Sequence, residues 1–578
     1  MTDKSLTPII EFTNFTFKYR AQVEPTLYDI NLKIYPGEKI LIIGPSGSGK
    51  STLANCINGL VPHIYTGDIS GSVTIAGKNA KELDIFNISK TVGTVLQDTD
   101  GQFIGLTVAE DIAFALENNM IPQQEILEKV ARTAETVEVS SLLECAPGEL
   151  SGGQKQRVSM AGVMIEDIEV MLFDEPLANL DPATGKRAIE LIDSIQKDEK
   201  KTVIIIEHRL EDALYCDADR IIVVNEGRIA ADLSPDDLLA TDILNETGIR
   251  EPLYVTALKY AGCVIESEDE AGQISTMHID KHASKVRDWY YSTEAVPVIE
   301  HKNDVLSIEN VSFSYNETRK TLADISFTVK EGEMMAIVGK NGAGKTTLSN
   351  LICGFINPDS GVIKLKGEDI APLSIKERGE RVGLVMQNPN QMISKTMIFD
   401  EVALGLVTRG VPEDEIKERV NNVLKICGLY PFRNWPVSAL SYGQKKRVTI
   451  ASILVLEPEI IILDEPTAGQ DYRHYTEIME FIKSINEEAG TTIIMITHDM
   501  HLMLEYTERA VVIADGVLLA DSTPAAILTN SEIADKAYLK RTSLYDLSKA
   551  CGIDDADGFT EHFIMMERKL REEVNHGA

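Results

Sequence analysis

A glycine-rich segment at residues 44–52, GPSGSGKST, follows the apolar run 40–43 and precedes a segment typical of a helix. This order of strand, loop and helix is the context that a phosphate-binding loop requires. Its glycines let successive backbone N–H groups turn toward one anion, and the helix adds its positive N-terminal end. Lys50 can then reach the β- and γ-phosphates of a nucleotide, and Ser51 can hold Mg²⁺. The residues expected to form this loop are Gly44, Pro45, Ser46, Gly47, Ser48, Gly49, Lys50, Ser51 and Thr52.

A second segment of this kind, GKNGAGKTT at residues 339–347, follows the apolar run 335–338. Lys345 lies 295 residues after Lys50, and four further pairs of residues are each separated by 290 positions. Those pairs are Gln97 with Gln387, Ser151 with Ser441, Asp174 with Asp464, and His208 with His498. So constant an offset indicates an internal duplication, which predicts two copies of one nucleotide-binding domain. The second loop consists of Gly339, Lys340, Asn341, Gly342, Ala343, Gly344, Lys345, Thr346 and Thr347.

The two domains are expected at residues 8–245 and 304–541. Within the first, apolar strands alternate with helical patterns, and charged residues follow the strands. This order predicts an α/β domain whose site lies along one edge of the sheet. Strands are expected at residues 9–19, 31–35, 70–77, 92–97, 170–173 and 203–206, and a helical pattern from about 107 to 143. Residues 246–303 are interpreted as an acidic connector with some helix, and residues 542–578 as a small helical appendage.

Two carboxylates follow the same apolar strand in each domain, as Asp174-Glu175 and Asp464-Glu465. The first of each pair lies where it can hold the Mg²⁺ shell, and the second can orient and polarise an attacking water. His208 and His498 follow another apolar strand, from which an imidazole can contact the γ-phosphate. A solvated acidic turn or a structural histidine would be the simpler interpretation of one copy alone. The recurrence of the whole set favours catalysis, with Glu175, His208, Glu465 and His498 as the catalytic candidates.

The net charge of −34, from 56 Lys and Arg against 90 Asp and Glu, disfavours polyanionic partners such as nucleic acid or acidic lipid. The seven cysteines are scattered without a C-x-x-C pair, which fits a reducing compartment and gives no zinc or iron–sulfur spacing. The sequence has no signal-like N-terminus and no run of about 18 apolar residues. If the protein serves a membrane, we therefore expect other chains to span it.

The order of motifs resembles that of ATP-binding-cassette (ABC) transporter ATPases: phosphate loop, glutamine loop, Leu-Ser-Gly-Gly-Gln signature at 150–154, Asp-Glu-Pro and terminal histidine. The resemblance covers nearly all of both halves. It implies an α/β fold with two tandem ABC-type P-loop ATPase domains, each with a RecA-like core sheet, an antiparallel β subdomain and a helical subdomain. It also implies ATP and Mg²⁺ as cofactors. The metal-binding candidates are then Ser51, Gln97 and Asp174 in the first domain, and Thr346, Gln387 and Asp464 in the second.

In this family the signature of one domain caps the nucleotide held by the other, so the resemblance implies two composite sites. Site one would combine the first loop with Ser441, Gly443 and Gln444, and site two the second loop with Ser151, Gly152, Gly153 and Gln154. Tyr19 and Tyr315 match the aromatic residue on which adenine stacks, although strands favour tyrosine in any case. Tyr442 departs from the family pattern because it replaces a signature glycine. Its bulk could hinder approach to the γ-phosphate at site one or could point away.

The segments that follow Gln97 and Gln387 resemble those of energy-coupling-factor importers, which take up vitamins and transition-metal ions. This subgroup implies separate membrane subunits, including a substrate-binding membrane protein, and a peripheral location on the cytoplasmic face of the cell membrane. Two alternatives remain: a soluble twin-cassette ATPase that acts on the ribosome or nucleic acid, and a twin-cassette sugar importer ATPase. The acidic connector disfavours the first, since phosphate contacts need Lys and Arg. Intact Lys50, Lys345, Glu175 and Glu465 disfavour the second, in which one site is commonly degenerate.

Overall fold

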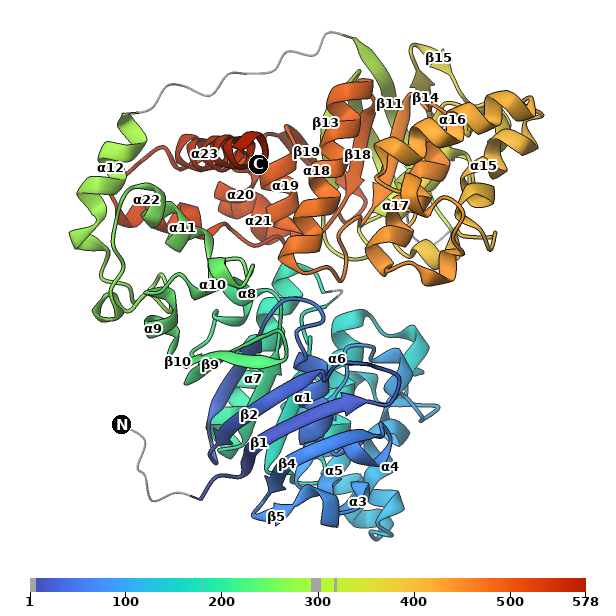
Figure 1. Ribbon diagram of the computed structural model, residues 1–578. Helices are drawn as coiled ribbons and strands as arrows, with labels where there is room; N and C mark the ends of the chain where they lie inside the picture. The colour runs from blue at the N-terminus through green and yellow to red at the C-terminus, as the bar shows by residue number, and fades with distance from the viewer. Residues whose placement is uncertain (1–6, 179, 293–302, 317–319, 578) are drawn as a thin grey trace. The chain divides into compact units, whose positions relative to one another are not determined.

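The computed structural model describes residues 7–178, 180–292, 303–316 and 320–577 (Figure 1). Contacts divide the chain into two compact units near Asp288. Among the described residues, no helix combines the length and the apolar character needed to cross a bilayer.

The first unit is built on a six-stranded sheet whose central strands are fully buried. Five of its strands are parallel, and β10 pairs antiparallel with β9. Parallel strands covered on both faces read as continuous apolar runs, which is why the sequence predicts them well. In sheet order the strands are β10 (Arg228–Leu233), β9 (Arg220–Asn225), β3 (Lys39–Ile43), β8 (Thr202–Ile206), β7 (Val170–Asp174) and β6 (Val92–Val95).

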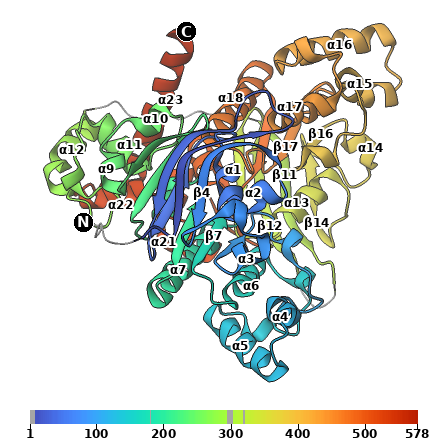
Figure 2. The ribbon, with the colours of Figure 1, turned by 60° about the horizontal axis from the view of Figure 1, so that its bottom comes forward.

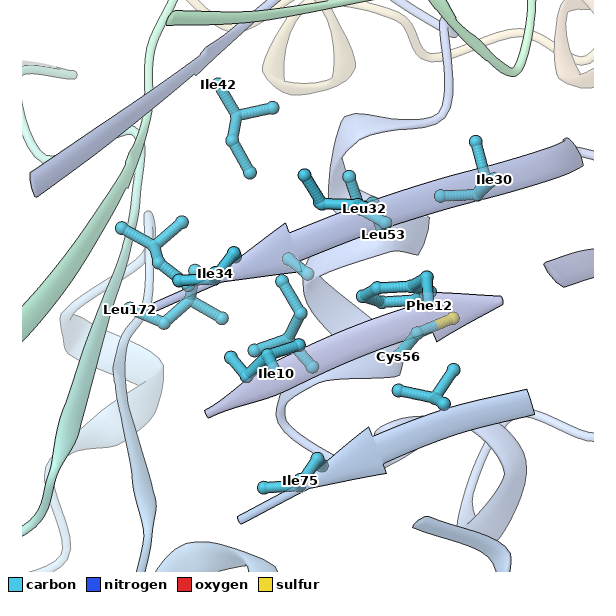
Figure 3. Close-up of a cluster of buried hydrophobic side chains, with 14 of the residues drawn as sticks. Ile10, Phe12, Ile30, Leu32, Ile34, Ile42, Leu53, Cys56, Ile75 and Leu172 are labelled. Atoms are coloured by element: carbon cyan, nitrogen blue, oxygen red, sulfur yellow. The ribbon is translucent and has the colours of Figure 1, made fainter. Parts of the chain in front are cut away.

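A second, antiparallel sheet of order β2-β1-β4-β5 completes the core of this unit. Its strands are β2 (Leu27–Ile34), β1 (Ile10–Tyr19), β4 (Gly67–Ile75) and β5 (Lys78–Asn79). Alternate side chains of these strands pack against α1 (Lys50–Ile57), the helix that follows the phosphate loop. Figure 3 shows part of this layer, with Ile10, Phe12, Ile30, Leu32 and Ile75 from the strands and Leu53 and Cys56 from α1. The apolar core thus fixes the start of α1 and with it the loop.

The helical part of the first unit contains two helices where the sequence pattern predicts one region from 107 to 143. They are α4 (Val108–Asn118) and α5 (Gln123–Thr136), and Figure 2 shows them beside α6 (Gly152–Met164). The break falls at residues 119–122, where Met120 has a left-handed backbone (φ 56°) and Pro122 precedes α5. Proline cannot donate the backbone hydrogen bond that a continuous helix needs. The expected helical region is thus present and consists of two helices separated by this turn.

The second unit repeats this plan. Its six-stranded sheet has the order β16 (Val382–Val385), β17 (Ile460–Asp464), β18 (Thr492–Ile496), β13 (Met334–Val338), β19 (Arg509–Ala514) and β20 (Val517–Ser522). Its antiparallel sheet consists of β12 (Leu322–Lys330), β11 (Asp304–Phe313), β14 (Ser360–Leu365) and β15 (Glu368–Asp369). The equivalent helices are α13 (Lys345–Cys353), α15 (Ile398–Thr408), α16 (Glu413–Ile426) and α17 (Tyr442–Leu454). The expected α/β fold with two tandem P-loop cassettes is confirmed.

Two further segments are helical. In the sequence, β10 is followed by α9 (Pro235–Leu239), α10 (Ile243–Glu246), α11 (Leu253–Tyr260) and α12 (Ala283–Tyr291). The N–H of Leu253 donates to Glu211 at 2.9 Å, which ties α11 to the first unit. The chain closes with α22 (Ser543–Ala550) and α23 (Ala556–Gly577), and α23 is held in the second unit by an ion pair of 2.7 Å between Arg571 and the buried Glu505.

Candidate functional site

Both glycine-rich loops lie where the sequence predicts, between a buried strand and a helix N-terminus. Lys50 is buried, and its Nζ donates to the carbonyls of Gly44 and Pro45 at 2.8 and 3.0 Å. Lys345 makes the same pair of contacts to Gly339 and Lys340, at 2.7 and 3.0 Å. Each lysine is therefore the first residue of its helix, and its side chain folds back onto the carbonyls of its own loop.

The first glycine of each loop is required by a close backbone approach. A Cβ atom on Gly44 would lie 2.1 Å from the carbonyl oxygen of Val224, and one on Gly339 would lie 2.0 Å from that of Ile513. No side chain fits at those distances, so any other residue would push the loop away from its strand. Gly49 and Gly344, just before the helices, have φ angles of 107° and 108° that favour glycine as well.

The glutamine, glutamate and histidine of each cassette converge on one carboxylate. In the first, Glu175 accepts from the amide nitrogen of Gln97 at 2.5 Å and lies 2.7 Å from Nε2 of His208. In the second, Glu465 accepts from Gln387 at 2.8 Å and lies 2.8 Å from a ring nitrogen of His498. Each cassette thus brings three groups that are far apart in sequence into one cluster. A carboxylate held from two sides keeps a fixed direction, as a group that orients water needs.

The backbone of both glutamates supports this geometry. Glu175 and Glu465 have φ angles of 50° and 44°, a left-handed conformation that is uncommon outside glycine. Their N–H groups donate to the carbonyls of Ile206 and Ile496, each at 2.9 Å. The adjacent strand therefore holds the turn in a conformation that a free peptide would rarely adopt, and such conformations concentrate at functional sites.

The two carboxylates of each pair have opposite electrostatic environments. Burial and the neighbouring negative charge of Glu175 raise the pKa of Asp174 to about 6. Burial and the charge of Glu465 likewise raise the pKa of Asp464 to about 6. Burial alone would raise the pKa of Glu175 too, but its hydrogen bond and attraction to His208 outweigh burial and lower it. The glutamate therefore stays ionised at neutral pH, as a group that polarises water should.

The candidate metal ligands have the chemistry that Mg²⁺ prefers. They comprise hydroxyl, carboxylate and amide oxygens, all hard donors. Ser51 and Thr346 are exposed at the mouths of the loops. The amide nitrogen of Gln97 donates a hydrogen bond to Glu175, so its amide oxygen remains available as a ligand for a cation. The residues present thus fit Mg²⁺, and this assignment stays a prediction.

The two tyrosines expected under adenine lie next to their loops. The hydroxyl of Tyr19 is 3.1 Å from that of Thr52, and Tyr315 lies 3.4 Å from Thr347 in the second cassette. Tyr315 is 59% exposed, and its ring makes an edge contact with Phe313. Tyr19 makes edge contacts with Phe17 and Tyr65.

The signature residues form helix N-terminal caps. Ser151 caps α6, where its hydroxyl accepts from the N–H of Gln154 and the Gln154 side chain accepts from the Ser151 N–H. Ser441 and Gln444 repeat this capping box at α17. Both serines are exposed. Among the described residues, no hydrogen bond joins residues 151–154 or 441–444 to the phosphate loop of the same cassette, so their role toward a nucleotide stays a prediction.

Tyr442, which replaces a signature glycine, turns back onto its own cassette. Its hydroxyl donates to the carbonyl of Gln387 at 3.3 Å, and its side chain is 40% exposed. The side chain therefore lies along the glutamine loop.

Glu207, in the position before His208, is a buried residue whose role the motif order does not reveal. One of its oxygens accepts from the N–H of Leu177 at 2.9 Å, and the other accepts from the N–H groups of His208 and Arg209 at 2.7 and 3.2 Å. Burial raises its pKa. The second cassette has Thr497 at this place. The sequence did contain a signal for this role, because a charged residue follows a buried strand where the other copy has threonine.

Replacing Glu207 by alanine is expected to destabilise the first cassette. The change leaves three backbone N–H groups without their acceptor, at a cost of about 2–4 kcal/mol. ATP turnover should fall as well, because the His208 backbone loses its anchor. Thermal unfolding and ATPase rates measure both effects, and Thr497→Ala is the matched change in the other copy. An unchanged unfolding midpoint would contradict the anchoring role.

Comparison with known proteins agrees with this site. A family model described as ABC transporter matches residues 27–178 and 322–468, and one described as ATP-binding cassette cobalt transporter matches residues 241–313. An ABC transporter ATP-binding protein of Enterococcus faecalis is 59% identical over 565 residues, which span 98% of this chain and 99% of the relative. One of Clostridium perfringens is 58% identical over 563 residues, spanning 97% and 99%.

Among solved structures, cbiO1 from Clostridium perfringens, described as part of the ABC transporter complex cbiONQ, is 34% identical. The match covers 43% of this chain and 100% of that one, with a TM-score of 0.39. The two family matches and the full-length relatives decide the assignment: the chain belongs to the ABC transporter ATP-binding proteins and is an ATPase with two ATP-binding cassettes.

Proposed function

We propose that this ATPase powers an importer of the energy-coupling-factor type, with a vitamin or a transition-metal ion as the cargo. The segments after Gln97 and Gln387 support the subgroup. The family model that matches residues 241–313 is described as a cobalt transporter, which favours a transition-metal ion over a vitamin. Separate membrane subunits would carry the cargo, and the ATPase would lie on the cytoplasmic face of the cell membrane.

The observation that carries the mechanism is the Glu175 cluster and its copy at Glu465. Lys50 would bind the β- and γ-phosphates as the loop N–H groups surround them. Glu175 would orient and polarise the attacking water, and His208 would hold the carboxylate and approach the γ-phosphate. When bound, Mg²⁺ would neutralise phosphate charge, held by Ser51, Gln97 and Asp174. The second cassette would use the equivalent residues.

We further propose that each site is completed by the signature of the other cassette. The exposure of Ser151 and Ser441 at helix N-termini supports this, because a helix N-terminus with free N–H groups attracts phosphate. ATP would then join the cassettes, and hydrolysis would release them.

Expression of the chain with the membrane proteins that co-purify with it tests this function. ATP-dependent uptake of a transition-metal ion or a vitamin into vesicles is the expected result, and it should stop when both catalytic glutamates are changed to glutamine. Isolation of the chain with ribosomes or nucleic acid, and without membrane proteins, would instead support the soluble alternative. Uptake of a sugar would support the other alternative, a twin-cassette sugar importer ATPase.

The segments 98–110 and 388–401 are the proposed docking surface for a membrane subunit. The first begins beside the glutamine that contacts Glu175 and exposes Ile104 (64%) and Leu106 (81%) to solvent. Exposed apolar side chains that lie close together are a feature of interaction sites. Because this segment follows Gln97 directly in the chain, a displacement of Gln97 would also displace the proposed docking surface. Glu110 has an internal role, because its carboxylate accepts from the N–H groups of Leu106 and Thr107.

Charge reversal at Asp98 and Asp100 is expected to weaken co-purification with the membrane subunit and to leave ATP binding unchanged. The side chain of Asp100 lies outside the described ones, while Asp98 is exposed. Arginines on a partner helix would pair with these acids. Asp198→Lys combined with Glu199→Lys, on the exposed end of α7 (Pro182–Glu199), is the charge-matched control. If membrane association survives reversal at Asp98, Asp100 and Glu110 together, the docking surface lies elsewhere.

A further inference from the structure

The first turn of α17 is fastened to the glutamine loop of its own cassette by several side chains. Lys446 donates through Nζ to the carbonyls of Met386 and Gln387, at 2.8 and 2.9 Å. The hydroxyl of Tyr442 reaches the same Gln387 carbonyl at 3.3 Å. One turn of the signature helix therefore holds the backbone of the residue whose side chain contacts Glu465.

Lys446 is a costly residue in this place. It is 1% exposed, and among the described residues no carboxylate lies within ion-pair distance of its ammonium. Burying a charge without a carboxylate in contact is unfavourable, so the two carbonyl contacts, together with the longer-range attraction of Asp464 and Glu465, must compensate for lost water. An apolar residue or a glutamine could fill the space with less penalty. The presence of an ammonium here is thus best explained by its hydrogen bonds to the carbonyls of Met386 and Gln387.

The first cassette holds its glutamine loop by a different device. Gln156, which lies 290 positions before Lys446, donates to the carbonyl of Pro176 at 2.6 Å, in the turn after Glu175. Gly152 has no side chain at the position of Tyr442. The loop is braced from within by Gln102, whose amide donates to the carbonyl of Thr94 at 3.1 Å and accepts from the N–H of Leu96 at 3.2 Å.

Met392 occupies the position of Gln102 in the second copy, where its sulfur lies 3.2 Å from the N–H of Met386. A thioether is a weak acceptor and has no N–H to donate, so Met392 cannot make both contacts of Gln102. The second loop therefore depends on the signature helix for the bracing that the first loop supplies itself.

We propose that Lys446, assisted by Tyr442, is a positioning residue for Gln387 and makes the signature helix and the glutamine loop of the second cassette move as one body. The inference rests on the proposed ATPase mechanism and deepens it. Any displacement of α17 is then transmitted to Gln387 and on to Glu465. In the first cassette, Gln156 of α6 donates to Pro176 and not to the backbone of Gln97. The two cassettes should therefore respond differently when a nucleotide binds to their signatures.

The test uses ATP turnover by the full-length chain that carries Glu175→Gln, so that hydrolysis reports Glu465. Lys446→Gln introduces the residue of the first cassette and is expected to lower kcat about tenfold, with KM for ATP changed less than twofold. Lys446→Arg keeps a charged donor and should restore kcat to within about threefold of the parent. Lys445→Gln, the adjacent change with the same loss of charge, should have little effect because, among the described residues, the Lys445 ammonium donates only to the Asn390 side chain, at 3.3 Å.

A structural role alone would give another pattern. Hydrogen exchange at residues 386–392 should rise in Lys446→Gln, while the unfolding midpoint stays close to that of the parent chain. A fall in the midpoint shared by Lys446→Gln and Lys446→Arg, or a rise in KM with kcat unchanged, would overturn the positioning role. Tyr442→Phe is expected to lower kcat by twofold to threefold, since it removes one donor of 3.3 Å.

Failure of the inference and failure of the proposed function give separate results. If the unmodified chain hydrolyses no ATP, or if Glu465→Gln has no effect on hydrolysis, the proposed mechanism fails. If hydrolysis depends on Glu465 but is insensitive to Lys446→Gln, the mechanism stands and the positioning role is wrong.

Discussion

Replacing Glu175 and Glu465 together by glutamine is expected to lower ATP turnover by about 10²- to 10³-fold while ATP still binds. Glutamine keeps the size of the side chain and a hydrogen-bond acceptor, so the contacts with Gln97 and Gln387 can persist. The substitution removes the negative charge that we propose to polarise water. Phosphate release measures turnover, and equilibrium binding of ATP measures retention of the phosphate loops. Each single variant should keep part of the activity, because the other glutamate remains.

Glu270→Gln is the matched control for this pair. Glu270 is exposed and also has a left-handed backbone, with φ of 51°. The substitution therefore makes the same chemical change in the same backbone conformation away from the cluster, and turnover should be unchanged. Turnover by the double variant at the parent rate would show that neither carboxylate acts on the water.

The central sheets could be predicted because their strands are buried on both faces. Residues 170–173 and 203–206 are continuous apolar runs, and they correspond to β7 and β8. The charged residues after these runs then had to meet at one sheet edge, since parallel strands end together. The convergence of Glu175 and His208 follows from that topology. The helical pattern over 107–143 did not locate the turn between α4 and α5, because helical spacing continues on both sides of it.

The differences between the two cassettes were less predictable. The sequence shows that Gln156 and Lys446 differ, but the carbonyl that each reaches depends on the packing of three segments. The bulk of Tyr442 was visible, whereas its direction toward Gln387 follows from the rotamer that α17 allows. Repeats therefore reveal shared chemistry from sequence, while differences between copies need coordinates.

Replacing Lys50 by methionine is expected to remove most ATP binding at the first loop. The ammonium is the proposed charged donor to the phosphates, and its loss should weaken affinity by about 10²-fold or more. Lys345→Met should be present in every protein compared, so that binding reports the first loop alone. Lys39→Met is the control, because Lys39 is also buried and pairs with Asp193 at 2.7 Å outside the site. That variant should keep its affinity for ATP and lose stability.

The same lysine should give ATP binding a pH dependence. Burial lowers the pKa of Lys50 to about 8, and the negative charge of Glu175 opposes this shift. Phosphate binds the ammonium form, so affinity is fully present below pH 8 and should fall about tenfold per pH unit above it. Binding measured at pH 7 and pH 9 checks this. If the parent with Lys50 and the Lys50→Met variant lose affinity equally between those values, the lysine is not the titrating group.

Stability should change in the opposite direction from binding. Because the pKa of Lys50 is lower in the folded protein than its ordinary 10.5, the unfolded chain binds more protons between pH 8 and 10.5, and stability rises with pH there. Burial of the ammonium therefore opposes folding at pH 7, by on the order of 3 kcal/mol. Lys50→Met removes that penalty and should unfold at the same or a higher temperature than the parent. A clear fall in the unfolding midpoint would instead make Lys50 a residue that stabilises the fold.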